Sequence, residues 1–110
     1  MLDRSKARNG ALEQAIKTTE AIALANGLSD VEDAINSFWR LYWGELARVR
    51  DPSVELAMVA FGRELQRWQQ SGQKPNNMVQ LSLEVTSACQ NEIEASAKEI
   101  DAVRNRYSVF

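Results

Sequence analysis

Apolar residues recur every three or four positions along most of this chain, and that spacing restricts the fold more than any other feature of the sequence. The clearest case is the stretch from residue 52 to residue 71. Its apolar residues occupy one stripe of about 100° on a helical wheel: Val54, Ala57, Met58, Phe61, Leu65 and Trp68. This spacing is typical of an amphipathic helix and does not fit the alternation of a strand.

Three further segments show the same spacing, and together they predict helices at about residues 4–26, 29–50, 52–71 and 77–106. The last has the longest stripe: Met78, Leu81, Val85, Ala88, Cys89, Ile93, Ile100, Val103 and Tyr107. Because the connections are short, neighbouring helices must run antiparallel or cross steeply. We therefore predict an all-α fold, a single-domain four-helix bundle over residues 1–110, antiparallel up-down or irregular, with a long C-terminal helix. Residues 1–10 are polar enough for the first turns to fray.

Helix-ending and helix-starting residues fall between these segments. Asn26-Gly27 predicts the end of the first helix, and Ser29 with Glu32 has the spacing of a capping box at the start of the second. Asp51-Pro52 predicts a capping carboxylate followed by proline at the first helical position. Residues 71–77 combine Ser, Gly, Pro and Asn, which predicts a stop, a loop and a new start.

Composition matches an ordinary globular domain, with 110 residues, 45% hydrophobic and 25% charged. The net charge of −2 creates no positive field for phosphate backbones, so we do not expect a nucleic-acid partner. No apolar run approaches the roughly 18 residues of a membrane span, and the N-terminus lacks the apolar core of a signal peptide. We therefore expect a cytoplasmic protein, or the soluble domain of a membrane protein whose upstream anchor has been removed.

The residue types that carry most catalysis and metal binding are scarce. The chain contains no His and a single cysteine, Cys89, which excludes an intrachain disulfide and a zinc site of Cys and His ligands. Cys89 lies on the apolar stripe of the last helix, where a thiol behaves as a small hydrophobic group. We therefore expect no enzyme, no metal and no cofactor.

The run FWRLYWGE at residues 38–45 gathers aromatic residues in a chain that is otherwise poor in them. The helical wheel assigns Phe38, Leu41 and Tyr42 to the core stripe and places Trp39 and Trp43 on its flank. Other apolar residues miss the stripe of the third helix or end the chain. The candidate interaction surface consists of Trp39, Trp43, Leu56, Val59, Tyr107 and Phe110.

These features favour a non-enzymatic helical module that acts by protein–protein association, including self-association as a homodimer through the second helix and the C-terminal segment. One alternative is a small-molecule-binding helical bundle with an aromatic pocket. Trp39, Tyr42, Trp43 and Trp68 would line that pocket, with Arg40 or Glu45 at its mouth. The other is the soluble domain of a membrane-anchored protein.

Overall fold

The computed structural model describes the backbone of residues 2–44, 46 and 51–108, and the side chains of residues 9–44, 46 and 51–95. Its helical elements are α1 (Leu2–Leu24), the short 3-10 helix η1 (Leu28–Val31), α2 (Glu32–Trp43), α3 (Pro52–Ser71) and α4 (Met78–Ser108). The fold is all-α, with four helices packed against each other, as the apolar spacing predicted.

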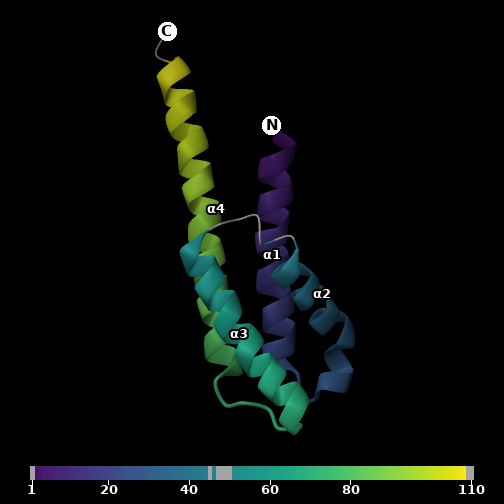
Figure 1. The fold of residues 1–110 in the computed structure, drawn as a ribbon. Helices are drawn as coiled ribbons and strands as arrows, with labels where there is room; N and C mark the ends of the chain where they lie inside the picture. Colours follow the sequence, from purple (N-terminus) through teal and green to yellow (C-terminus); the bar gives the residue numbers. More distant parts are fainter. Residues whose placement is uncertain (1, 45, 47–50, 109–110) are drawn as a thin grey trace.

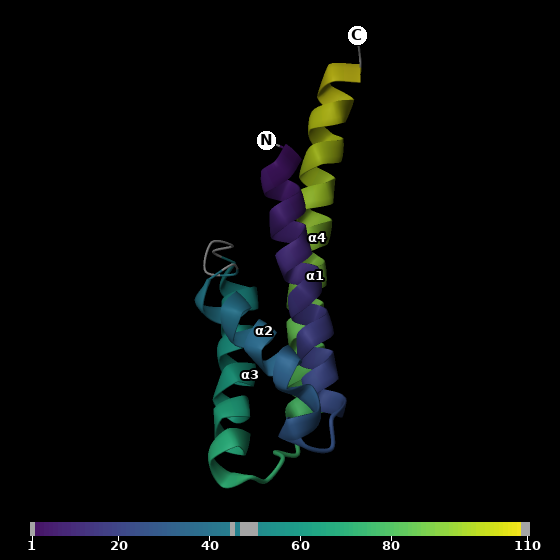
Figure 2. The ribbon, with the colours of Figure 1, turned by 90° about the vertical axis from the view of Figure 1, so that its right-hand side faces the viewer.

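The four α-helices alternate in direction along the chain (Figure 1). α1 and α4 form one long antiparallel layer, and α2 and α3 form a second layer over its lower half (Figure 2). The closest packing joins α1 to α4, α3 to α4 and α1 to α2. Because the second layer is shorter, the molecule is elongated, with dimensions of 61 × 22 × 20 Å.

The core lies where the two layers meet, and each of the four α-helices contributes to it. Its fully buried large side chains include Leu12 and Ile22 of α1, Phe38 of α2, Phe61 of α3 and Val85 of α4. The apolar stripe predicted for residues 52–71 is buried along its whole length. Periodicity therefore identified the buried face of α3 correctly.

The predicted signals at the two ends of α3 are confirmed. The Asp51 side chain accepts a hydrogen bond of 3.0 Å from the backbone N–H of Val54, and Pro52 occupies the first turn. At the other end, Gly72 has φ of 74°, and its N–H donates to the carbonyl of Trp68 at 2.8 Å. Glycine suits this left-handed position because it has no Cβ to clash.

Two other boundaries differ from the prediction. α1 ends at Leu24, and Gly27 has φ of −148°, so it forms no left-handed cap; it precedes η1. Ser29 lies inside η1, and the N-cap residues of η1 and α2, Gly27 and Val31, make no side-chain capping bond. The predicted capping box therefore does not form, because the chain enters α2 through a turn of 3-10 helix.

α2 ends at Trp43, earlier than the predicted residue 50. The N–H of Gly44 donates to the carbonyl of Arg40 at 2.9 Å, and the backbone then leaves the helical path. A Cβ at position 44 would lie 2.9 Å from that same carbonyl oxygen, so the turn requires glycine. Residues 45 and 47–50 lie outside the described part of the chain. α4 reaches Ser108, slightly beyond the predicted range.

Lys74, in the connection between α3 and α4, ties that connection to the end of α1. Its Nζ donates to the backbone carbonyls of Ala23 at 2.6 Å and Ala25 at 2.8 Å. The same ammonium lies 5.6 Å from the ring centroid of Trp68. Carbonyls at a helix C-terminus lack intrahelical partners and carry partial negative charge, so a cation is favoured there. Lys74 therefore contacts the end of α1 and Trp68 of α3 through one charged group.

We predict that Lys74→Met lowers the free energy of unfolding by about 1–2 kcal/mol, because it removes charge-assisted hydrogen bonds and leaves two carbonyls without that donor. Urea unfolding followed by circular dichroism measures the change. Lys17→Met, at an exposed position of α1, is the matched control and should change stability by less than about 0.5 kcal/mol. Equal effects of the two substitutions would show that the Lys74 contacts contribute nothing specific.

Candidate interaction surface

The aromatic run of α2 changes from core to surface along its length. Phe38 is fully buried, with its ring centroid 5.2 Å from that of Phe61 in α3. Trp39 is half-buried and meets Phe38 edge-on at a centroid distance of 5.0 Å. Edge-to-face contacts at such distances are favourable. Trp39, predicted as part of an interaction surface, is therefore partly covered by its own chain.

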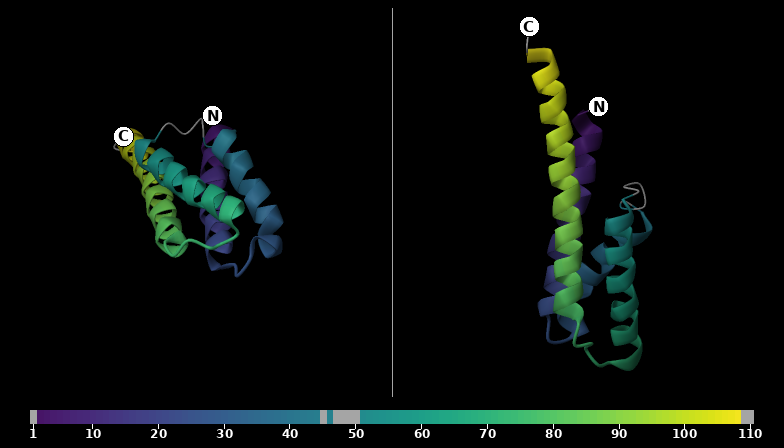
Figure 3. Two further views of the ribbon diagram at one scale, coloured as in Figure 1. Left: turned by 60° about the horizontal axis from the view of Figure 1, so that its bottom comes forward. Right: turned by 90° about the vertical axis from the view of Figure 1, so that its left-hand side faces the viewer.

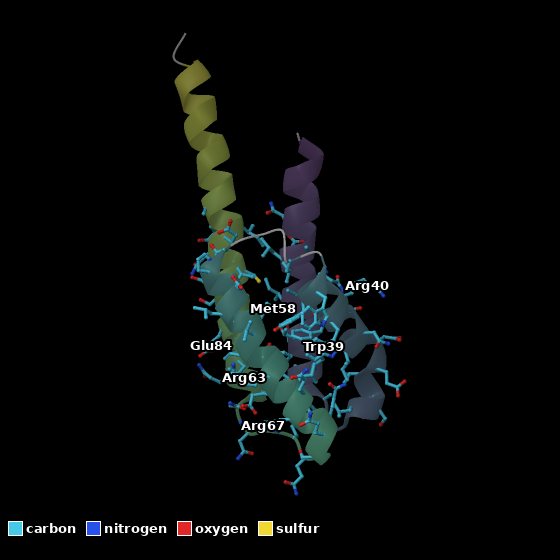
Figure 4. The ribbon with its side chains drawn as sticks, in the orientation of Figure 1. Trp39, Arg40, Met58, Arg63, Arg67 and Glu84 are labelled. Carbon is cyan, nitrogen blue, oxygen red and sulfur yellow. The ribbon has the colours of Figure 1, made fainter. Side chains whose placement is uncertain are left out.

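Tyr42 lies between the two tryptophans, and Trp43 is the exposed end of the run. The Tyr42 ring centroid is 5.3 Å from that of Trp39 and 4.8 Å from that of Trp43, both in edge-on geometry. Tyr42, predicted to be core, is half-buried, whereas Trp43 is 74% exposed. Figure 4 shows Arg40 pointing away from the bundle and Trp39 on the inner side of α2. The rings thus form a packed series that ends at the surface.

A glycine on α3 allows this series to pack closely. Gly62 is buried, and a Cβ there would lie 3.3 Å from Cε2 of Tyr42 and 3.5 Å from the ring of Phe38. α2 can therefore bring two rings against the α3 backbone without a side chain intervening. The sequence could not predict this contact, because an isolated glycine within a helix also occurs for reasons other than close packing.

The two candidates on α3 differ in exposure. Leu56 is 70% exposed, whereas Val59, which was also predicted to lie off the stripe, is half-buried. Leu56 lies at the rim of an open groove of about 370 Å³ between α3 and α4. The groove is lined by Ser53, Leu56, Ala57, Glu84, Ser87, Ala88 and Asn91.

The described groove is not the aromatic pocket of the small-molecule hypothesis. None of the four aromatic residues proposed for that pocket lines it, and Trp68 is a buried core residue 2% exposed. Three of the four, Trp39, Tyr42 and Trp43, pack against one another or against Phe38. Arg40 is exposed, and Glu45 lies outside the described residues. The geometry of the rings gives the pocket hypothesis no support.

The remaining predicted candidates lie near the end of the chain. Tyr107 belongs to α4, but its side chain is outside the described residues, as is Phe110 altogether. Three exposed apolar residues lie outside the predicted surface: Leu24 at 65%, Leu83 at 58% and Val79 at 47% exposure. Leu24 and Val79 lie at the end of the bundle where α1 finishes and α4 begins (Figure 1). The position of all three off the helical stripes was the available signal.

The polar groups of the described region form no constellation that indicates catalysis. No cluster of three or more Cys, Asp or Glu side chains suited to a metal ion occurs among residues 9–44, 46 and 51–95. Arg67 pairs with Glu64 at 3.3 Å on the outer face of α3, and its side chain is 70% exposed (Figure 4). The Glu64 side chain is 15% exposed, but because the Arg67 guanidinium is open to solvent the pair contributes little to stability.

Cys89 is fully buried on α4, as its position on the apolar stripe predicted. Burial, with a smaller contribution from the negative charge of Asp51, raises the pKa of the Cys89 thiol to about 11. Both effects disfavour the thiolate, which is the nucleophilic form. The sulfur is therefore a core atom in this fold.

Because the ordinary pKa of this thiol is 9.0 and burial raises it to about 11, the folded chain at pH 8 should contain about 100-fold less thiolate than the unfolded chain. We predict that Cys89 reacts with Ellman's reagent at least about 100-fold more slowly in native buffer than in concentrated urea. Above pH 9, preferential ionisation of the unfolded thiol should lower stability progressively up to about pH 11. Equal reaction rates in the two solvents would contradict the buried, protonated thiol.

A comparison with protein-family models, curated proteins and solved structures finds no significant match to this chain. Within its described residues, no helix combines the length and apolar character needed to cross a bilayer. The exposed apolar side chains are thus the features from which a function can be argued.

Proposed function

We propose that the protein is a non-enzymatic helical association module that forms a homodimer, using the outer end of α2 and the C-terminal part of α4. The observation that carries the proposal is Trp43, a tryptophan 74% exposed at the end of an otherwise packed series of rings. An exposed tryptophan held against a tyrosine presents a large apolar surface with little conformational entropy left to lose.

The energetics favour Trp43 as an interface residue. A tryptophan buries on the order of 200 Å² when it is covered. At about 25 cal/mol per Å², covering most of the exposed part would contribute a few kcal/mol to association. Tryptophan is also enriched among residues that dominate binding energy in interfaces. Leu56, 70% exposed, lies in the second turn of α3, and α3 begins at the same upper end of the second layer at which α2 finishes (Figure 2).

The chemistry of the described residues supports association over catalysis. The one thiol is buried with a raised pKa, and the chain has no His that could act as its base. The arginines of α3 lie on an exposed face, where Arg67 pairs with Glu64. The apolar side chains that remain exposed are better suited to contact with another protein surface.

We predict that the chain sediments as a dimer at tens of micromolar, and that Trp43→Ser raises the dissociation constant by at least about 10-fold. Sedimentation equilibrium with light scattering measures both. Arg63→Ser, at an exposed position of α3, is the matched control and should leave the constant within about 2-fold.

Two results would refute this proposal. One is a monomer at tens of micromolar for the unsubstituted chain. The other is a dimer whose dissociation constant changes neither with Trp43→Ser nor with removal of residues 109 and 110. Circular dichroism of each variant separates loss of association from loss of folding.

A further inference from the structure

The accessible surface area of the chain is larger than that expected for a compact monomer of the same mass. Its accessible surface is 7798 Å², whereas a compact protein of 12.4 kDa exposes about 6,100 Å². Its radius of gyration is 16.0 Å, compared with about 13 Å for a compact domain of this length. The excess of about 1,700 Å² exceeds the roughly 800 Å² that each partner contributes to a standard interface. The chain therefore has enough extra surface for a stable dimer.

The second layer ends well before α4 does. Ser53 in the first turn of α3 lines the same groove as Asn91 of α4, so α3 begins beside residue 91. Residues 92–108 of α4 continue beyond it for about 25 Å at 1.5 Å per residue. Residues 2–10 of α1 lie beside them, and we call these two segments the arm. On the side where α2 and α3 cover the lower half, neither helix covers the arm (Figures 2 and 3).

The sequence of the arm continues an apolar seam along α4. Ile93, Ile100, Val103 and Tyr107 follow one another at intervals of seven, three and four residues, the spacing of a coiled-coil seam. The positions are nearly symmetric about Ile100, with Ile93 seven residues before it and Tyr107 seven residues after it. A helix with this pattern is self-complementary in the antiparallel orientation, because residue 100 meets itself and residue 93 meets residue 107.

The arm is also close to electrically neutral, which permits like segments to pack. It contains six basic residues, Arg4, Lys6, Arg8, Lys98, Arg104 and Arg106, and five acidic residues, Asp3, Glu92, Glu94, Glu99 and Asp101. Six minus five gives a formal charge of +1. Two such arms meet without the strong repulsion of a highly charged pair.

Building on the homodimer proposed above, we infer that a second copy of this chain covers the arm, with the two α4 helices antiparallel over residues 92–108 and crossing near Ile100. Shape disfavours the parallel orientation. It would place the second layers of both copies at the same end of the paired α4 helices, where they would compete for the same space. In the antiparallel orientation, the end of each α4 reaches the upper end of the partner's second layer. Trp43 and Leu56 lie at that end, which links the arm to the surface of the proposed function.

Disulfide trapping with copper–phenanthroline tests this arrangement in the full chain, with the buried Cys89 left in place as the background. Ile100→Cys should form a disulfide dimer at least about 10-fold more than the unsubstituted chain. Ser108→Cys should not, because two residues 108 would lie about 24 Å apart, far beyond the roughly 7 Å that a disulfide can bridge. Leu83→Cys, exposed on the body of α4, is the matched control for accessibility and should remain monomeric.

A mixed experiment tests the register. Chains with Ser96→Cys and chains with Arg104→Cys, one carrying a size tag, should form more of the mixed disulfide than of either self-pair, since the two positions are equidistant from residue 100. Efficient trapping of Ser108→Cys with itself would overturn the antiparallel arrangement, whether or not Ile100→Cys is trapped as well, because a parallel pair brings both positions next to their own copies.

Sedimentation separates the failure of this inference from the failure of the proposed function. If Ile100→Glu forms a dimer of unchanged affinity and position 100 is not trapped, the pairing of the arms is refuted and the proposed homodimer is retained. A monomeric unsubstituted chain would refute both. A dimer that Ile100→Glu converts to a folded monomer, together with trapping at position 100, supports both.

Discussion

The packing of α1 against α4 is the constraint on which the rest of the structure depends. α1 packs on both α4 and α2, while α3 packs on α4, so each helix of the second layer depends on one helix of this pair. Small residues such as Ala15 and Cys89 are fully buried in the core. Among the described residues three hydroxyl side chains are buried, and two of them meet between α1 and α4: Thr19 donates to the carbonyl of Ala15 at 2.8 Å, and Ser82 donates to Thr19 at 3.4 Å. The contact of Ser82 with Thr19 shows which part of α4 lies beside which part of α1.

The sequence predicted the helix ends correctly where the residues that determine an end lie close together in the chain. Asp51, Pro52 and Gly72 act through backbone groups a few residues away, so their roles could be predicted from the sequence. The prediction failed at Ser29, because the chain forms a 3-10 turn there. It also failed at Gly44, where the apolar spacing of the sequence continues but the backbone leaves the helical conformation. Lys74 could not be predicted at all, since its partners, Ala23 and Ala25, lie about fifty residues earlier in the chain.

The candidate surface could be predicted only in part, for a related reason. A helical wheel orders residues by direction from one axis, and it correctly separated Phe38 from Trp43. It cannot tell what covers the flank of a helix. Trp39 and Val59 were placed off the core stripes, yet both are half-buried. The rings of Phe38 and Tyr42 cover part of Trp39. Gly62 allows α3 to approach those two rings closely. This is a contact between two helices, so the pattern of one helix cannot reveal it.

The difference in length between the two layers connects the fold to the proposed association. A four-helix bundle with helices of equal length buries one apolar stripe from each along its whole length. Here α3 has 20 residues and α2 has 12, whereas α4 has 31, so a bundle of this chain alone must leave part of α4 without the second layer. If α4 were polar beyond residue 91, that extension would need no cover. The apolar seam instead continues in the sequence through Ile93, Ile100, Val103 and Tyr107, and the proposed pairing of two α4 helices rests on this pattern.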